Sequence, residues 1–251
     1  MDLAYLVPSR TSVENVALGL GILVAFFAVT ALIRRRLPDL RYVGLVLAAL
    51  LVAHLALFID PIRAFFPHAD ATWNWGGKLL SIVVTVLCVA LIPVVSWRDV
   101  GLTWQQRGVR RAILAAIVMC AFGWAIGLLL TGFHTTIPSR EAILYQATMP
   151  GLNEEPLYRG LALVLIDRAF WSEGWDFLGA RIGWGAILTS IWFGTIHGVG
   201  LTHGHFMFDW VVVAITGTIG FFLAWIRMRT GSLAIPIVAH NVINVGNQFI
   251  G

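Results

Sequence analysis

Side chains that can perform acid–base chemistry are concentrated in the C-terminal half of the 251-residue sequence, within otherwise apolar segments. Glu154 and Glu155 head one such segment, and a carboxylate at its edge can act as a general base. Arg159 follows Glu155 by four positions, so the two side chains can pair on one face of a helix. An ion pair at a helix start would explain Glu155 and Arg159, but it leaves Glu154 without a structural purpose.

The residues around these glutamates predict the start of a helix. Pro150 and Gly151 interrupt the chain, Asn153 is a good N-cap residue, and Pro156 fits a first helical turn. In this interpretation both glutamates lie at the positive end of a helix dipole, which favours their ionised forms.

Two further pairs of residues are spaced by one helical turn. Phe193 and His197 lie near the end of one apolar segment, and His240 and Asn244 lie inside another. Taken singly, each pair is equally compatible with hydrogen bonding between helices. Together with Glu154, two imidazoles and an amide form a set that could hydrolyse a peptide bond.

The elements that must position these residues are membrane-spanning helices. Hydrophobic residues make up 59% of the chain and charged residues 12%, with a mean hydropathy of +0.83. Soluble domains are about half apolar and about a quarter charged, so a soluble fold is excluded. The net charge of +4 comes from arginines that flank apolar runs rather than from a basic stripe with aromatics, which argues against nucleic-acid binding.

A spanning helix needs about 20 mostly apolar residues. We therefore predict an all-α polytopic membrane protein, a bundle of about eight transmembrane helices that forms one domain over residues 1–251. Residues 1–135 would supply scaffold spans, and residues 150–251 the motif-bearing catalytic half. The predicted spans cover residues 13–33, 42–59, 79–96, 112–131, 153–170, 182–197, 208–226 and 233–250.

Lysine and arginine are distributed unequally between alternate connections. One set of connections carries twelve of them and the other carries four, among them Lys78 and Arg140. The positive-inside rule then places both termini outside the cytoplasm and the polar site toward the outer face. We expect an integral multi-pass protein of the plasma (inner) membrane of a prokaryote.

The ordered motifs Glu154-Glu155-x-x-x-Arg159, Phe193-x-x-x-His197 and His240-x-x-x-Asn244 resemble those of the CPBP family. This family comprises the CAAX-protease and bacteriocin-processing (Abi-type) glutamic intramembrane proteases. The resemblance covers about residues 150–246 and implies an endopeptidase without an obligatory metal or cofactor.

The resemblance also implies a role for each motif residue. Glu154 would be the general base that activates water, assisted by His197, while His240 and Asn244 would stabilise the oxyanion. Glu155 and Arg159 would support and orient Glu154, with Phe193 completing the second motif. The partners would be the lipid bilayer and a membrane-anchored protein or peptide substrate, whose identity, like the oligomeric state, is not encoded in a recognisable way.

Two alternatives remain open at this level. A zinc-dependent membrane protease could use His197, His203 or His240 with the glutamates, although the sequence lacks His-Glu-x-x-His. His203, His205 and Asp209 form a second possible metal site, for which solvated loop residues are the simpler interpretation. Alternatively, the protein could be a non-catalytic bacteriocin-immunity or membrane scaffold protein of the same family.

Overall fold

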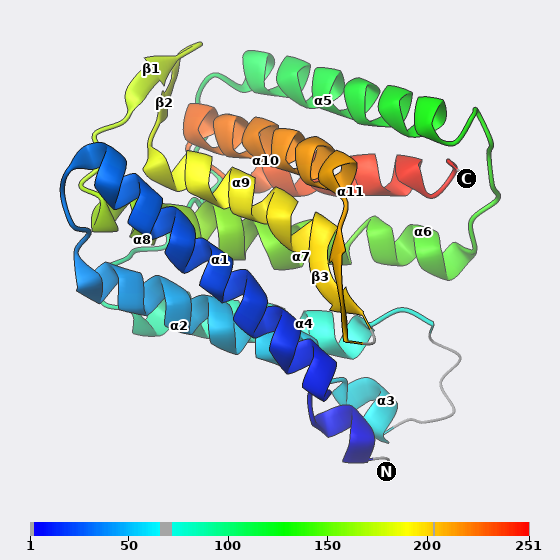
Figure 1. Cartoon of the computed structure of the whole chain (residues 1–251). Helices are drawn as coiled ribbons and strands as arrows, with labels where there is room; N and C mark the ends of the chain where they lie inside the picture. The colour runs from blue at the N-terminus through cyan, green and yellow to red at the C-terminus, as the bar shows by residue number, and fades with distance from the viewer. Residues whose placement is uncertain (1–2, 66–71, 203, 251) are drawn as a thin grey trace.

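Figure 1 shows a computed structural model of the chain, which describes residues 3–65, 72–202 and 204–250. Within these ranges the chain forms a helical bundle with two short antiparallel hairpins. In chain order the helical elements are η1 (Leu3–Leu6), α1 (Arg10–Arg34), α2 (Leu40–Leu57), α3 (Pro61–Phe65), α4 (Trp75–Leu91), α5 (Val109–Leu130), α6 (Arg140–Gln146), α7 (Met149–Glu155), η2 (Pro156–Ala162), α8 (Leu163–Ala169), α9 (Trp184–Gly198), α10 (Trp210–Thr230) and α11 (Ala234–Asn247). The hairpin strands are β1 (Trp175–Phe177) with β2 (Ala180–Ile182), and β3 (Val199–Thr202) with β4 (His205–Phe208).

The prediction of an all-α membrane bundle is confirmed. Each predicted span coincides with a helix, and the fifth coincides with the continuous run α7–η2–α8. Among the described residues, four segments are long and apolar enough to cross a membrane: Arg10–Arg34, Leu40–Phe65, Val109–Leu130 and Trp210–Thr230. The motif helices α9 and α11 are only about 22 and 21 Å long, less than the hydrocarbon core of about 30 Å.

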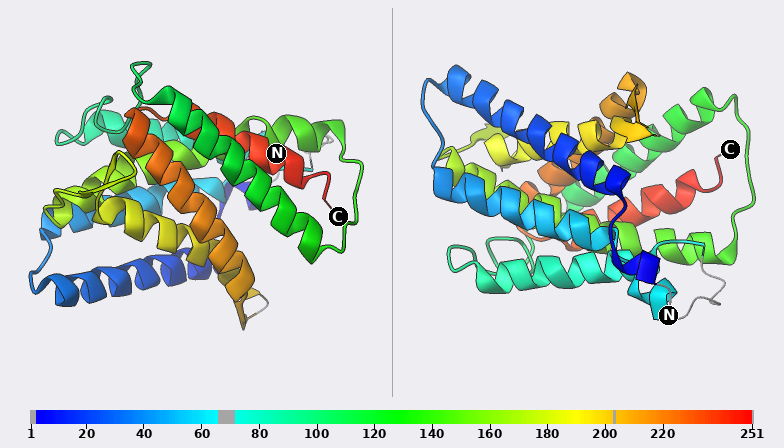
Figure 2. Two further views of the ribbon diagram at one scale, coloured as in Figure 1. Left: turned by 90° about the horizontal axis from the view of Figure 1, so that it is seen from above. Right: turned by 60° about the horizontal axis from the view of Figure 1, so that its bottom comes forward.

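The bundle brings the three motifs together through helix packing. Helix α7 packs between α4 and α11, while α9 packs along α10 and against η2. Figure 1 and Figure 2 show the hairpin β1–β2 at one end of the bundle and the hairpin β3–β4, with α3 and α6, at the other. All three motifs therefore reach the interior from neighbouring helices.

The connections that carry the twelve bases meet at a single end of the bundle, which we call the arginine-rich end. Arg34 Nη1 donates to the carbonyl of Phe170 at 2.6 Å, which ties the end of α1 to the end of α8. The backbone N–H of Arg107 donates to the carbonyl of Thr230 at 3.1 Å, which ties the loop before α5 to the end of α10.

The predicted N-cap at Asn153 is wrong. Thr148 occupies the N-cap position of α7, Pro150 lies in its first turn, and Asn153 and Glu154 follow in its second turn. Pro156 instead opens the π-helix η2, a wider turn of the kind found at functional sites. Because Pro150 starts the helix, both glutamates lie beyond the first turn, where the helix dipole has little effect.

The sequence did not predict the two hairpins. The segment after His197, interpreted as a solvated loop, forms β3 and β4, which pair from Val199 with Phe208 to Thr202 with His205. Asn15 of α1 holds β3 in place, because its side chain both accepts from the N–H of Leu201 at 2.7 Å and donates to its carbonyl at 3.0 Å.

Candidate active site

Glu154 forms a close ion pair with Lys78. The Nζ atom of Lys78, in the first turn of α4, lies 2.6 Å from Oε1 of Glu154 and 3.2 Å from Oδ1 of Asn153. The two charged side chains are 12% and 14% exposed, respectively. The second oxygen of Glu154, Oε2, has no hydrogen-bond partner within the described residues, so it is free to accept a proton.

Glu155 joins the first motif to the third. Its Oε1 atom lies 3.1 Å from Nη1 of Arg159 and 2.7 Å from Nδ1 of His240, and all three residues are buried. Since an ionised carboxylate can only accept, Nδ1 of His240 must carry the proton. The other ring nitrogen of His240, Nε2, then points toward Glu154, with 3.8 Å to Oε2.

Arg159 is fully buried and is held largely by aromatic and backbone surfaces. Its Cζ atom lies 4.2 Å from the ring centre of Phe193, a distance typical of a cation–π contact. Gly220 of α10 leaves room for the guanidinium, because a Cβ there would approach Nη2 to 2.8 Å. Phe193 also contacts His197, with ring centres 4.4 Å apart, so it separates the buried cation from the second motif histidine.

Glu154 and His197 line one cavity of about 210 Å³, whose walls come from α1, α2, η2 and α9. Nδ1 of His197 donates to the carbonyl of Phe193 at 2.7 Å, because a carbonyl only accepts. Nε2 of His197 has no hydrogen-bond partner among the described residues and is an acceptor in the neutral ring, and His197 is exposed to the cavity.

A second histidine, His54, lines the same cavity. Its Nδ1 donates to the carbonyl of Leu50 at 2.6 Å, the same arrangement as in His197. Its Nε2 accepts from the hydroxyl of Tyr158 at 2.9 Å, so both of its nitrogens are occupied.

Asn244 is the one predicted site residue that takes no part in the contacts described above. It lies on α11 one turn beyond His240, half-buried, and its side chain makes no hydrogen bond to any described residue. The neighbouring Asn241 makes the contacts instead: it accepts from the N–H of Gly151 at 2.8 Å and donates to the carbonyl of Thr148 at 3.3 Å. Asn241 thereby fixes α11 against the start of α7.

The alternative metal set of His203, His205 and Asp209, for which solvated loop residues were the simpler interpretation, lies only partly within the described residues. His203 lies outside them, His205 is exposed on β4, and Asp209 accepts from the N–H groups of Val211 and Val212, which makes it the N-cap of α10. Nor do the described residues contain a group of three or more His, Cys, Asp or Glu side chains placed to hold a metal ion.

Three site residues were not identified from the sequence: Lys78, His54 and Tyr158. Lys78 did offer a signal, since it is the only lysine in the sequence and all other basic residues except histidine are arginines. His54 offered a weaker one, as a histidine in the middle of an apolar span. Tyr158 lies within the first motif and is buried against Phe193, with ring centres 5.4 Å apart.

The fold and this site together define a class: a membrane-embedded helical bundle with a water-accessible carboxylate and imidazoles suited to hydrolysis. Residues 136–246 match the family model described as Type II CAAX prenyl endopeptidase Rce1-like. This match confirms the resemblance to the CPBP family over the segment that contains all three motifs. No curated protein and no solved structure gives a significant match to the chain.

Proposed function

We propose that the protein is a glutamic intramembrane endopeptidase that cleaves a membrane-anchored or membrane-associated protein or peptide. The observation that carries the proposal is the shared cavity: Glu154 and His197 both line it, and neither Oε2 of Glu154 nor Nε2 of His197 has a hydrogen-bond partner among the described residues. A water molecule between two such acceptors is held and oriented for attack.

In the proposed mechanism Glu154 takes a proton from this water as the water oxygen attacks the carbonyl carbon of the scissile bond. His197 orients the water through Nε2. The tetrahedral intermediate then collapses, the C–N bond breaks, and Glu154 returns the proton to the departing amine. Glu154 thus carries one proton from the water to the amine, and its carboxylate is ionised at the start and at the end of the cycle.

The oxyanion needs donors on the opposite side of the carbonyl from the attacking water. We propose His240 and Asn244 as these donors, and the geometry sets a requirement for each of them. Because Nδ1 of His240 already donates to Glu155, the ring can donate through Nε2 as well only when both nitrogens carry a proton. Asn244 has an uncommitted amide that can turn toward substrate.

The ion pair of Lys78 with Glu154 supports the same mechanism. A fixed cation 2.6 Å from Oε1 holds that oxygen in place and leaves Oε2 without a hydrogen-bond partner among the described residues. Lys78 is therefore proposed as a positioning residue for the general base. Glu155, which is paired with Arg159, fixes the orientation of the His240 ring through Nδ1.

The test is the variant Glu154→Gln, which keeps the shape of the side chain and removes its basicity. Termini of membrane and secreted proteins are compared between cells with the wild-type chain and cells with the variant, with Glu14→Gln as a matched control. Glu14 forms an exposed ion pair with Arg10 far from the motif residues in the sequence. We expect Glu154→Gln to abolish the cleaved termini and Glu14→Gln to preserve them.

Purified protein separates the alternatives, using a substrate identified from those termini. Cleavage retained by folded Glu154→Gln would refute the mechanism. Inhibition by a chelator that zinc reverses would favour a zinc protease, and a biological phenotype that survives in Glu154→Gln would favour a non-catalytic role.

A further inference from the structure

Another cavity lies at the arginine-rich end, and Glu154 is not among the residues that line it. We call it the arginine basin; it has a volume of about 950 Å³, within the range of small-molecule sites. Its walls come from the loop before α5 and from the ends of α8 and α10, and they carry five arginines: Arg41, Arg98, Arg107, Arg168 and Arg227.

Pairing inside the basin leaves three of these arginines without an ionic partner. Arg41 pairs with Asp39 and Arg168 with Asp99, each at 3.1 Å. Another lining acid, Asp167, accepts from the N–H of Gly185 in the first turn of α9 at 2.7 Å. In the described part of the chain, the guanidinium groups of Arg98, Arg107 and Arg227 form no ion pair.

Arg227 is the feature that makes this a built site rather than a charged surface. It is only 5% exposed, and its Nη2 donates to the carbonyl of Asp99 at 2.5 Å. Its Nε has no hydrogen-bond partner among the described residues. Gly101, with φ +80°, lies directly against the guanidinium and has no space for a side chain. Gly101 lies against Nε, whereas Nη1 makes no hydrogen bond to a described residue and is the donor left for an acceptor that a ligand supplies.

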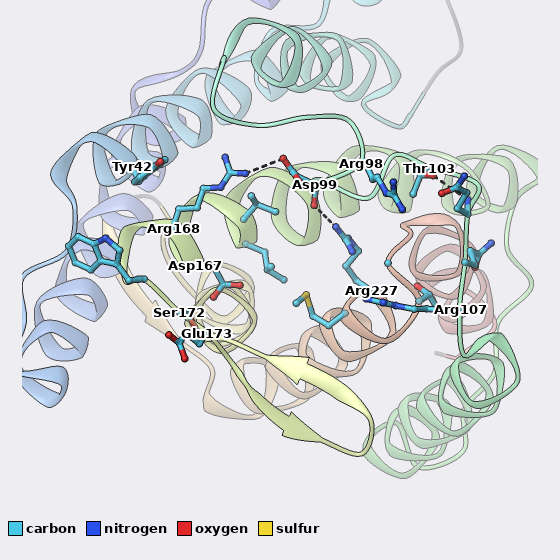
Figure 3. A pocket seen from close by; sticks show the side chains of 18 of the residues that line it. Tyr42, Arg98, Asp99, Thr103, Arg107, Asp167, Arg168, Ser172, Glu173 and Arg227 are labelled. Carbon is cyan, nitrogen blue, oxygen red and sulfur yellow. Dashed lines mark hydrogen bonds and ion pairs between the residues drawn. The ribbon is translucent and has the colours of Figure 1, made fainter.

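The three unpaired arginines share one side of the basin. Figure 3 shows Arg98, Arg107 and Arg227 on that side, with Ser172 and Glu173 across from them. Guanidinium groups match the geometry of phosphate oxygens, because their N–H donors form planar forks. A cavity that presents several such forks favours a phosphate over a single carboxylate.

We infer that the arginine basin binds a phosphate group, held by Arg98, Arg107 and Arg227. Two sources share this chemistry: the head group of an anionic phospholipid and a soluble phosphate. Basic pockets between membrane helices commonly bind lipid head groups. The exposed Trp171, over which Arg36 stacks at 3.7 Å, lines the basin and has the amphipathic character of an interfacial anchor.

The test measures thermal unfolding of the full chain in detergent with two probes. Inorganic phosphate is compared with potassium chloride at equal ionic strength. In mixed micelles, phosphatidylglycerol is compared with diacylglycerol of the same acyl chains. Specific binding to the folded state raises the Tm. A rise with inorganic phosphate identifies a soluble ligand, a rise with phosphatidylglycerol alone identifies a lipid head group, and both results support the proposal.

Variants test whether the effect belongs to the basin. Arg107→Gln and Arg98→Gln alter exposed side chains, so both should fold, and each should weaken the apparent affinity by about tenfold. Arg110→Gln is the matched control, an exposed arginine three positions from Arg107 that does not line the basin. No rise in Tm with either probe, or equal weakening in Arg110→Gln and Arg107→Gln, would overturn the inference. Neither result bears on the proposed protease.

Discussion

The candidate active site and the arginine basin differ in whether their charged side chains are paired with one another. In the active site, the charged side chains are buried and paired with one another: Glu154 with Lys78, and Glu155 with Arg159. In the basin, two exposed arginines and one buried arginine have no ionic partner in the described chain, and the cavity is more than four times larger. Buried charges must be paired to be tolerated, whereas charges that face water need not be. The first arrangement therefore depends on the fold, while the second is available to a ligand.

The largest effect that this comparison predicts is on stability. Arg159→Met leaves Glu155 buried without its cation, which should cost about 3–5 kcal/mol of unfolding free energy. Arg107→Gln changes an exposed basin residue and should stay within about 0.5 kcal/mol of the wild type. Thermal or denaturant unfolding in detergent measures both. Similar losses of unfolding free energy in the two variants would contradict the proposed difference between the two regions.

The next prediction sharpens the comparison within the active-site cavity. His54 and His197 are anchored alike through Nδ1, but only His197 has an unoccupied Nε2. If that nitrogen orients the attacking water, His197→Gln should lower kcat by about 100-fold, as for loss of an acid–base group. His54→Gln should lower it by only a few fold. Equal losses in initial-rate measurements would assign both histidines the same role and contradict the proposal.

A smaller effect is expected at Lys78. Lys78→Met removes the cation beside Glu154 and should lower kcat/KM by about tenfold, with the acid limb of the pH–rate profile moved to higher pH. Lys78→Arg keeps the charge and should restore most of the activity and the original profile. A purely structural lysine would instead lower the yield of folded protein without moving the profile.

The fold was largely predictable because it depends on composition and on runs of apolar residues. The eight helical segments follow from the runs of apolar residues, and the pair Glu155–Arg159 follows from its spacing; the structure has both. What the sequence could not specify were contacts between distant segments. Lys78 and Glu154 are 76 positions apart, and their meeting depends on how α4 packs against α7. The start of α7 was misplaced for a related reason: two prolines six positions apart each fit a first turn, and packing selected Pro150.

The smallest predicted effect concerns an acid outside the membrane-spanning helices. This acid is not buried as Glu155 is, and unlike the basin arginines it has several hydrogen-bond partners. Glu141 of α6 accepts from the hydroxyl and N–H of Thr72, from the N–H of Trp73 and from the indole of Trp75. These donors, led by the Thr72 hydroxyl, lower the pKa of Glu141 from 4.5 to about 2.

Because the folded state lowers this pKa, Glu141 should contribute stability above about pH 4.5, and the contribution should be lost as the pH falls toward 2. The Tm of the wild type should therefore fall more steeply from about pH 4.5 toward pH 2 than that of Glu141→Gln, which has no carboxylate to protonate. Glu14→Gln, at an exposed ion pair, should follow the wild-type curve. Parallel curves for all three proteins would show that the segment Thr72–Trp75 is held against α6 by packing alone, for which the stacked rings of Trp73 and Tyr145 would then be responsible.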